Sequence, residues 1–167
     1  MEQAKKKGLP TWAVVLIVLG AFAVVGLPIL SALAIYGVRK YMRAAKSAEA
    51  TAALGSFSSG MVGCGEKQGA LPPSTAAVPA SLAAVSGMKY QSAPNDWADV
   101  GFTCAGFSLA TPQYFQYQWV QESESKGALR AQADLDGDGA PEEFFEATVT
   151  CAGGRCTTTA PTNTGSP

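Results

Sequence analysis

Apolar residues fill one unbroken stretch of the sequence, residues 11–37, in which no side chain is charged. About 20 apolar residues are enough for a helix to cross a bilayer, so this stretch can span one with some tilt. Basic residues flank it, and Trp12 and Tyr36 lie near the two expected membrane–water boundaries. A cleaved secretory signal is the alternative, but the stretch is too long for one and lacks an Ala-x-Ala exit. The pattern therefore predicts a single transmembrane segment over residues 9–37, after a leader at 1–8.

Beyond this segment the pattern becomes amphipathic, because apolar residues recur mostly at spacings of three and four. The apolar positions are Val38, Tyr41, Met42, Ala45, Ala48, Ala52, Ala53, Phe57 and Met61. This periodicity predicts that the helix leaves the membrane and continues over residues 38–63, ending among the glycines of 60–65. Since only one side of this half is apolar, another part of the chain is expected to cover it.

Three later segments alternate between apolar and polar residues, which is typical of strands with one buried face. The apolar positions are Phe115, Tyr117 and Trp119 in the first segment, Leu129, Ala131, Ala133 and Leu135 in the second, and Phe145, Ala147, Val149 and Cys151 in the third. Their short connections predict an antiparallel meander, and residues 102–109 are expected to add a fourth strand. If the meander covers the helix, Phe57 should be buried under residues such as Trp119 or Leu129. Tyr41 should stay exposed at the membrane edge.

These elements predict an α+β fold, in which a long N-terminal helix, transmembrane and then amphipathic, packs on a small C-terminal antiparallel β-sheet. The sheet is expected over residues 102–156. Residues 64–101 are rich in Pro, Ala, Ser and Gly and predict a connecting loop, with a short helix at 78–85. The tail over 157–167 has little apolar surface to bury and is predicted to be disordered.

Charge distribution and the absence of histidine narrow the possible functions. Residues 1–50 contain seven Lys or Arg against two acidic residues, whereas residues 51–167 contain eleven acidic residues against five basic ones. The basic part suits a membrane surface, and the acidic part argues against a nucleic-acid partner. A chain without histidine lacks the base of Ser-His-Asp and Cys-His catalysis and cannot form a His-ligated metal site. Paired carboxylates at 134–138 are the alternative for acid–base catalysis, but they lie on a predicted turn with no apolar pocket implied around them. We therefore do not expect an enzyme.

The four cysteines allow three disulfide pairings. Cys151 and Cys156 enclose Ala-Gly-Gly-Arg, a short loop that can bring their sulfurs together, which leaves Cys64 to pair with Cys104. A four-cysteine zinc site is the rival interpretation, but the CxxC spacing of zinc knuckles is absent. Two disulfides would place the C-terminal domain in an oxidising compartment.

One short run of alternating carboxylates, Asp-Leu-Asp-Gly-Asp-Gly, resembles the opening of many calcium loops. The candidate ligands are Asp134, Asp136, Asp138 and Glu143, with Glu142 and Glu146 as alternatives to Glu143. An EF-hand needs a bidentate Glu at the twelfth position, where this chain has Phe145, so a looser calcium site is expected. A solvent-exposed turn rich in Asp and Gly is the alternative, and the pattern leaves both interpretations open.

The order of these features resembles the type IV pilin and pseudopilin family. The resemblance rests on the basic leader ending Lys7-Gly8, the apolar segment directly after it, and the run Tyr-Met-Arg-Ala-Ala-Lys-Ser-Ala-Glu-Ala at 41–50. It implies cleavage by prepilin peptidase between Gly8 and Leu9. It also implies a calcium loop at the aspartate run 134–138, because pseudopilins carry one in that part of their sheet. It also implies a single-pass inner-membrane protein, with its C-terminal domain in the periplasm or at the cell surface. Such a subunit would assemble with pilin-like subunits into a homo- or hetero-oligomeric filament.

The family usually carries Glu at the fifth residue after the cleavage site, where this chain has Ala13. That Glu pairs with the amino terminus of a neighbouring subunit, and an unpaired ion among apolar helices is very costly. Ala13 therefore predicts a minor, tip-located subunit of a type IV pilus or type II secretion-type filament rather than a major pilin. The alternative is a membrane-anchored exported domain that does not polymerise and binds calcium or a protein partner.

Overall fold

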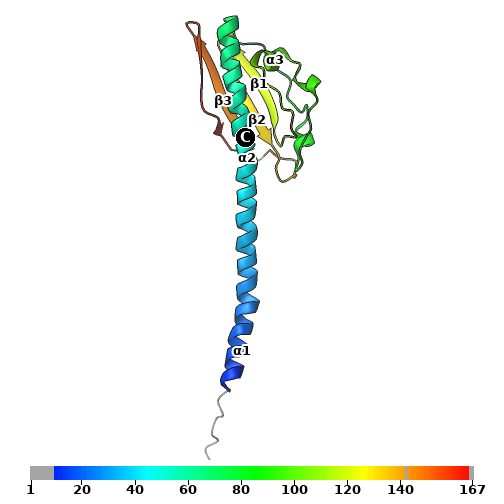
Figure 1. Ribbon diagram of the computed structural model, residues 1–167, viewed down its shortest axis with the longest axis vertical. Helices are drawn as coiled ribbons and strands as arrows, with labels where there is room; N and C mark the ends of the chain where they lie inside the picture. Colours follow the sequence, from blue (N-terminus) through cyan, green and yellow to red (C-terminus); the bar gives the residue numbers. More distant parts are fainter. Residues whose placement is uncertain (1–9, 142, 166–167) are drawn as a thin grey trace, which may run out of the picture. The chain divides into compact units, whose positions relative to one another are not determined.

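The computed structural model of the protein describes residues 10–141 and 143–165. These residues form a long N-terminal helix and a small antiparallel sheet, so the predicted α+β class is confirmed (Figure 1). The chain divides into two compact units, Met1–Met42 and Arg43–Pro167.

The described part of the first unit is helical, and its large apolar side chains are exposed. A helix α1 (Thr11–Ala21) is followed by a π-helical turn η1 (Phe22–Gly26), and α2 (Leu27–Gln68) begins directly after it. Pro28 gives a reason for the π-helical turn, because proline has no N–H to donate and the hydrogen bonds before it must rearrange. The large apolar side chains of this unit are 45–78% exposed. The helix is long and apolar enough to cross a membrane.

In the second unit, one face of α2 is buried against the rest of the unit. The buried positions recur every three or four residues: Ala50, Ala53, Leu54, Phe57, Met61 and Cys64. The prediction is therefore right only for the later part of the stripe: Ala53, Phe57 and Met61 are buried, together with Ala50 and Leu54, which the sequence analysis did not include. The remaining predicted positions are exposed: Val38, Tyr41, Met42, Ala45, Ala48 and Ala52. Tyr41 is 78% exposed and Phe57 is fully buried, which confirms the predicted difference between them.

The end of α2 differs from the prediction, because the helix continues through its glycines to Gln68. A Cβ on Gly60 would lie 2.0 Å from the carbonyl oxygen of Ala105, and a Cβ on Gly65 would lie 2.8 Å from the Sγ of Cys156. Both glycines therefore let another chain segment approach the helix closely. The predicted helix end at these glycines is wrong, because they serve packing rather than termination.

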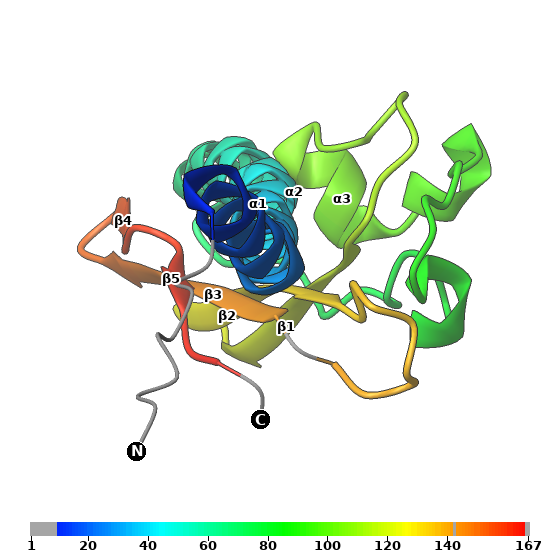
Figure 2. The same cartoon turned by 90° about the horizontal axis from the view of Figure 1, so that it is seen from below.

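The described residues form a five-stranded antiparallel sheet. Its strands are β1 (Gln116–Ser123), β2 (Lys126–Ala133), β3 (Glu143–Ala152), β4 (Arg155–Thr158) and β5 (Thr162–Asn163). Strands β1 to β4 pair in sequence order, and β5 pairs with β3. The C-terminal part of α2 lies over one face of the sheet (Figure 2), and fully buried residues such as Trp119, Leu129 and Val149 come from alternate strand positions. The predicted antiparallel meander is thereby confirmed.

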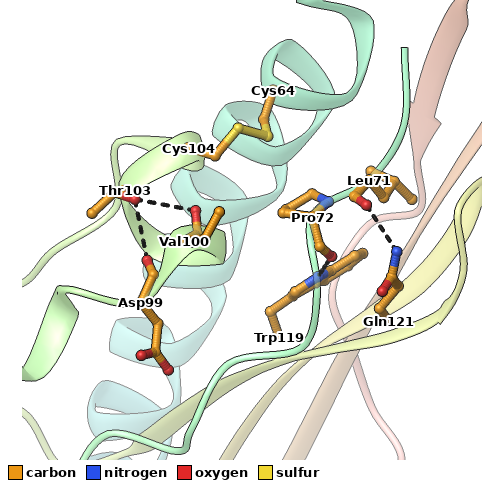
Figure 3. Close-up of a disulfide and its surroundings, with 9 residues drawn as sticks. All are labelled: Cys64, Leu71, Pro72, Asp99, Val100, Thr103, Cys104, Trp119 and Gln121. Carbon is orange, nitrogen blue, oxygen red and sulfur yellow. Dashed lines mark hydrogen bonds between the residues drawn. A yellow bond between two sulfur atoms is a disulfide. The ribbon is translucent and has the colours of Figure 1, made fainter. Parts of the chain in front are cut away.

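The segment after α2 runs along the outer edge of β1. Thr75 N donates to Trp119 O at 3.0 Å, and Val78 and Tyr117 exchange two backbone hydrogen bonds of 2.9 and 2.8 Å. The indole Nε1 of Trp119 donates to Pro72 O at 2.8 Å (Figure 3). This segment therefore satisfies backbone groups that an open strand edge would leave unpaired.

Two 3₁₀ helices lie in the described connecting loop, η2 (Leu82–Val85) and η3 (Pro94–Trp97). The first lies within residues 78–85, where the sequence predicts a short helix. Trp97 is 4% exposed, and its Nε1 donates to Ser92 Oγ at 3.0 Å. The loop is therefore fixed to the core by a buried aromatic residue.

A short helix, α3 (Val100–Ala105), stands where the sequence predicts a fourth strand, and that prediction is wrong. Gly106 ends α3 in the left-handed conformation with φ 61°, which turns the chain before it can extend. Phe102 and Phe107, on either side of this turn, pack on Phe57 with ring centroids 5.4 and 4.3 Å away. The aromatic partners of Phe57 thus come from this segment rather than from a strand.

The tail predicted to be disordered over 157–167 forms strands in its described part. β4 makes a hairpin with β3, and β5 pairs with β3 through Phe145 opposite Asn163 and Glu146 opposite Thr162. The tail buries little apolar surface, as the sequence indicates. Its structure comes instead from hydrogen bonds to the edge of β3, which a compositional argument does not foresee.

Candidate functional site

Three carboxylates come together in the loop between β2 and β3. Among the described residues, Asp134, Asp136 and Asp138 place one carboxylate oxygen each within 4.8 Å of one another. Asp134 is 1% exposed, whereas Asp136 and Asp138 are exposed. The alternating pattern in the sequence therefore gathers three acidic groups at one point.

Asp134 organises this loop from its buried position. Its carboxylate accepts hydrogen bonds from Ser86 Oγ at 2.6 Å, from Gly137 N at 2.7 Å and from Gly139 N at 2.9 Å. The two glycines have φ values of 83° and 93°, which side chains other than glycine rarely adopt. The hydrogen bond from Ser86 and those from the loop N–H groups lower the pKa of Asp134, although burial opposes this shift. The Asp134 carboxylate is therefore ionised at neutral pH.

The loop is also held by the connecting segment near η2, a contact that sequence reasoning missed. Gly87 N donates to Asp134 O at 2.8 Å, beside the hydrogen bond that Ser86 donates to the same residue. Ser86 precedes Asp134 by 48 residues. A local motif carries no signal for such a partner.

The fourth predicted ligand, Glu143, is not part of the carboxylate group. Its Oε2 accepts a hydrogen bond from Asn163 Nδ2 at 2.6 Å, which ties the start of β3 to β5. Glu146 pairs with Arg130 at 3.0 Å, and Glu142 lies outside the described residues. The structure thus brings together three of the four predicted ligands. These three aspartates could hold a hard divalent cation such as calcium, if carbonyl or water oxygens supplied the remaining ligands.

The four cysteines form two disulfides, and the pairs are the ones that the sequence predicts: Cys64 with Cys104 and Cys151 with Cys156. The first joins α2 to α3 (Figure 3), and the second closes the β3–β4 hairpin. Cys156 N donates to Glu66 Oε1 at 3.1 Å, which fixes this hairpin to the end of α2. The first disulfide therefore links α2 covalently to α3, whereas the second joins two strands and lies against Gly65 of α2.

Glu49 on α2 holds the chain just before β1, a contact that the sequence does not indicate. Its Oε1 accepts a hydrogen bond from Tyr114 N at 2.7 Å. The Nζ atoms of Lys46 and Lys89 lie 4.5 and 4.7 Å from the centroid of the Tyr114 ring. Burial raises the pKa of Glu49, against the opposing effects of the Tyr114 N–H and of Lys89. The hydroxyl of Tyr117 is buried without a hydrogen-bond partner in the described part of the chain. Its burial and the nearby charge of Glu49 both raise the pKa of Tyr117.

The remaining candidate surface is the exposed apolar surface of the first unit. Ala13, which stands where pilins carry Glu, lies on α1 and is partly buried. The predicted leader at 1–8 and the processing residues Gly8 and Leu9 lie outside the described residues.

Comparisons of the chain with protein-family models, curated proteins and solved structures find no match. The structure itself defines a class of protein. It is a disulfide-bonded α+β domain on a helix that is long and apolar enough to span a membrane.

Proposed function

We propose that the chain is a pilin-like structural subunit, present in few copies, of a type IV pilus or a type II secretion-type filament. The observation that carries this proposal is the change of surface along one helix. The large apolar side chains of its N-terminal part are 45–78% exposed, whereas Ala50, Leu54 and Phe57 are fully buried within a folded domain. A subunit that inserts among lipids or apolar helices at one end and presents a domain at the other needs this division.

The exposed apolar part supports an anchor in the inner membrane. Moving apolar surface out of water yields roughly 25 cal/mol per Å², so a helix exposed in this way is strongly favoured in lipid or between neighbouring helices. Lys40 and Arg43 follow the apolar segment and suit lipid headgroups. Two disulfides suit an oxidising compartment, so we assign the C-terminal domain to the periplasm or the cell surface.

Ala13 supports a minor subunit over a major one. If the chain is cleaved before Leu9, the new amino terminus carries a positive charge four residues before Ala13. A subunit above it would bury that charge among apolar helices, and Ala13 offers no carboxylate to a neighbour. A position at the filament tip, where no further subunit covers this end, avoids the cost.

The mature N-terminus tests the proposal. The intact mass of the chain, purified from membranes of cells that contain prepilin peptidase, should place Leu9 first. Gly8→Val should leave the chain uncleaved, and the control Gln3→Val should be cleaved like the wild type. Wild-type chain that keeps Met1 in the presence of active peptidase would remove the support for a pilin-like subunit.

A second candidate function is a membrane-anchored exported domain that does not polymerise and binds calcium or a protein partner. The alanine at position 13 and the loop of three aspartates favour it. This alternative predicts an uncleaved chain and no incorporation into filaments. The same mass measurement therefore separates the two candidates.

A further inference from the structure

The face of the sheet turned away from α2 contains a pocket. It has a volume of about 100 Å³, and three neighbouring strands supply its lining: Gln116, Gln118, Arg130, Gln132 and Phe144. The pairing registers place these side chains in two rows across the strands, and Glu146 on β3 completes the second row beside Arg130. The pocket is therefore built on paired strands rather than on loops, which holds its groups in place.

The glutamine side chains are fixed by hydrogen bonds. Gln132 Nε2 donates to Gln116 Oε1, and Gln116 Nε2 donates to Pro79 O at 2.6 Å. Gln118 Nε2 donates to Thr75 O at 3.2 Å. Gln116 is 6% exposed, which is unusual for a glutamine on an outer sheet face. The Oε1 atoms of Gln118 and Gln132 have no hydrogen-bond partner among the described residues, so they are available as acceptors.

Arg130 is the charged residue of the lining, and Glu146, beside the pocket on β3, balances its charge. Arg130 Nε donates to Glu146 Oε2 at 3.0 Å, with the two side chains 41% and 31% exposed. The guanidinium carbon lies 6.0 Å from the centroid of the Phe144 ring. The terminal Nη atoms of Arg130 have no partner in the described part of the chain, so they remain available as donors. The pocket thus combines free donors, free acceptors and an aromatic ring, with no net charge.

We propose that this pocket binds a neutral sugar residue at the end of a glycan. A sugar hydroxyl donates and accepts at once, and amide, guanidinium and carboxylate groups side by side can engage two adjacent hydroxyls. The ring of Phe144 offers apolar surface to the C–H face of a sugar. Glu146 beside Arg130 disfavours phosphate or sulfate, and the polar lining disfavours a lipid tail. The small volume admits part of one sugar residue, which suits a terminal residue with the rest of the glycan in solvent.

The test uses ¹⁵N-labelled full-length chain in dodecylphosphocholine micelles, because the headgroup of this detergent contains no sugar. D-Glucose, D-galactose, D-mannose and N-acetyl-D-glucosamine are titrated separately to about 50 mM, a range that detects millimolar affinity. The side-chain amide signals of Gln118 and Gln132 report binding. We expect a saturable shift of these signals with at least one of the four sugars.

Two variants and one control locate the site. Gln132→Ala and Phe144→Ala should each weaken binding of that sugar about tenfold, the effect of losing roughly one hydrogen bond or one ring contact. Thr150→Ala, on the same face of β3 but outside the pocket, should bind like the wild type. An unchanged amide spectrum elsewhere in each variant shows that the sheet is intact.

The proposal is overturned if none of the four sugars gives a saturable shift. It is also overturned if sodium sulfate shifts these signals and the sugars do not, or if both pocket variants bind the sugar like the wild type. None of these results depends on whether the chain is part of a filament.

Discussion

Replacing Gly60 by alanine should destabilise the second unit, whereas the same replacement at Gly63, in the next turn of α2, should stabilise it. Both residues lie inside the helix, where alanine is favoured over glycine by about 1 kcal/mol. A Cβ at Gly63 would meet no atom of the described residues within 4 Å. A Cβ at Gly60 would lie 2.0 Å from the backbone oxygen of Ala105. The two substitutions are therefore chemically identical and differ in their surroundings.

The magnitude follows from how far α3 can move. A carbon and an oxygen that are not bonded need more than 3 Å, so α3 would have to retreat by over 1 Å. The disulfide between Cys104 and Cys64 ties the neighbour of Ala105 to the turn after Gly60, which opposes this retreat. For Gly60→Ala we expect an overpacking cost at the upper end of the usual range, about 3 kcal/mol. The gain in helix propensity offsets about 1 kcal/mol of this cost. Gly60→Ala should then be about 3 kcal/mol less stable than Gly63→Ala, since the second variant gains propensity alone.

Thermal unfolding of the full chain in micelles measures this difference. Trp97 and Trp119 are buried in the unit, so their fluorescence follows its unfolding. For a unit of this size, about 3 kcal/mol corresponds to a difference of about 10 °C in Tm. A Tm of Gly60→Ala equal to or above that of Gly63→Ala would refute the close packing of α3 on α2.

Further measurements test the core, the first disulfide and the aspartate loop. Phe57→Ala should lower the free energy of unfolding by about 3–5 kcal/mol in denaturant titrations, because it removes a fully buried ring that packs on two others. Peptide mapping without reduction should find Cys64 linked to Cys104, and replacing both by serine should cost about 4 kcal/mol for the loop of 40 residues. The pKa of Asp134 is lower in the folded chain than in the unfolded one, where it is about 4, so the ionised carboxylate stabilises the fold above about pH 4. Acidification below that pH should therefore lower Tm, and it should lower Tm less in Asp134→Asn. Calcium should raise the Tm of the wild type, EGTA should reverse the effect, and Asp134→Asn should weaken it; no rise with millimolar calcium would contradict the predicted calcium site.

The architecture could be predicted because its signals are local and periodic. The apolar stretch specifies a helix long enough to cross a membrane, and the spacing of buried helix positions and the alternation in three strands specify which side of an element is covered. The glycines of α2 could not be interpreted in this way. A glycine ends a helix or admits a neighbour depending on what lies beside it, and at Gly60 that neighbour is Ala105, 45 residues further along the chain. The same reason explains α3, where the turn at Gly106 and the packing of Phe102 decide against a strand.

In the candidate site, too, local features could be predicted from the sequence and long-range contacts could not. The three aspartates follow from a short motif, and the structure gathers them. The partners that decide their roles come from elsewhere in the chain. Ser86 donates a hydrogen bond to Asp134 and holds it in the loop. Asn163 donates one to Glu143, which lies apart from the three aspartates. Neither partner belongs to a local motif, so sequence reasoning could name the acidic residues but not assign each its role.

The composition of purified filaments tests the proposed function most directly. Filaments sheared from cells that express the chain at its natural level are purified, and peptides of each subunit are quantified by mass spectrometry. The proposed function predicts that this chain is present, cleaved before Leu9, at a small fraction of the main subunit. Its absence from filaments, with the uncleaved chain found as a monomer in the membrane, would contradict a pilin-like role, and filaments made mainly of this chain would contradict a minor one.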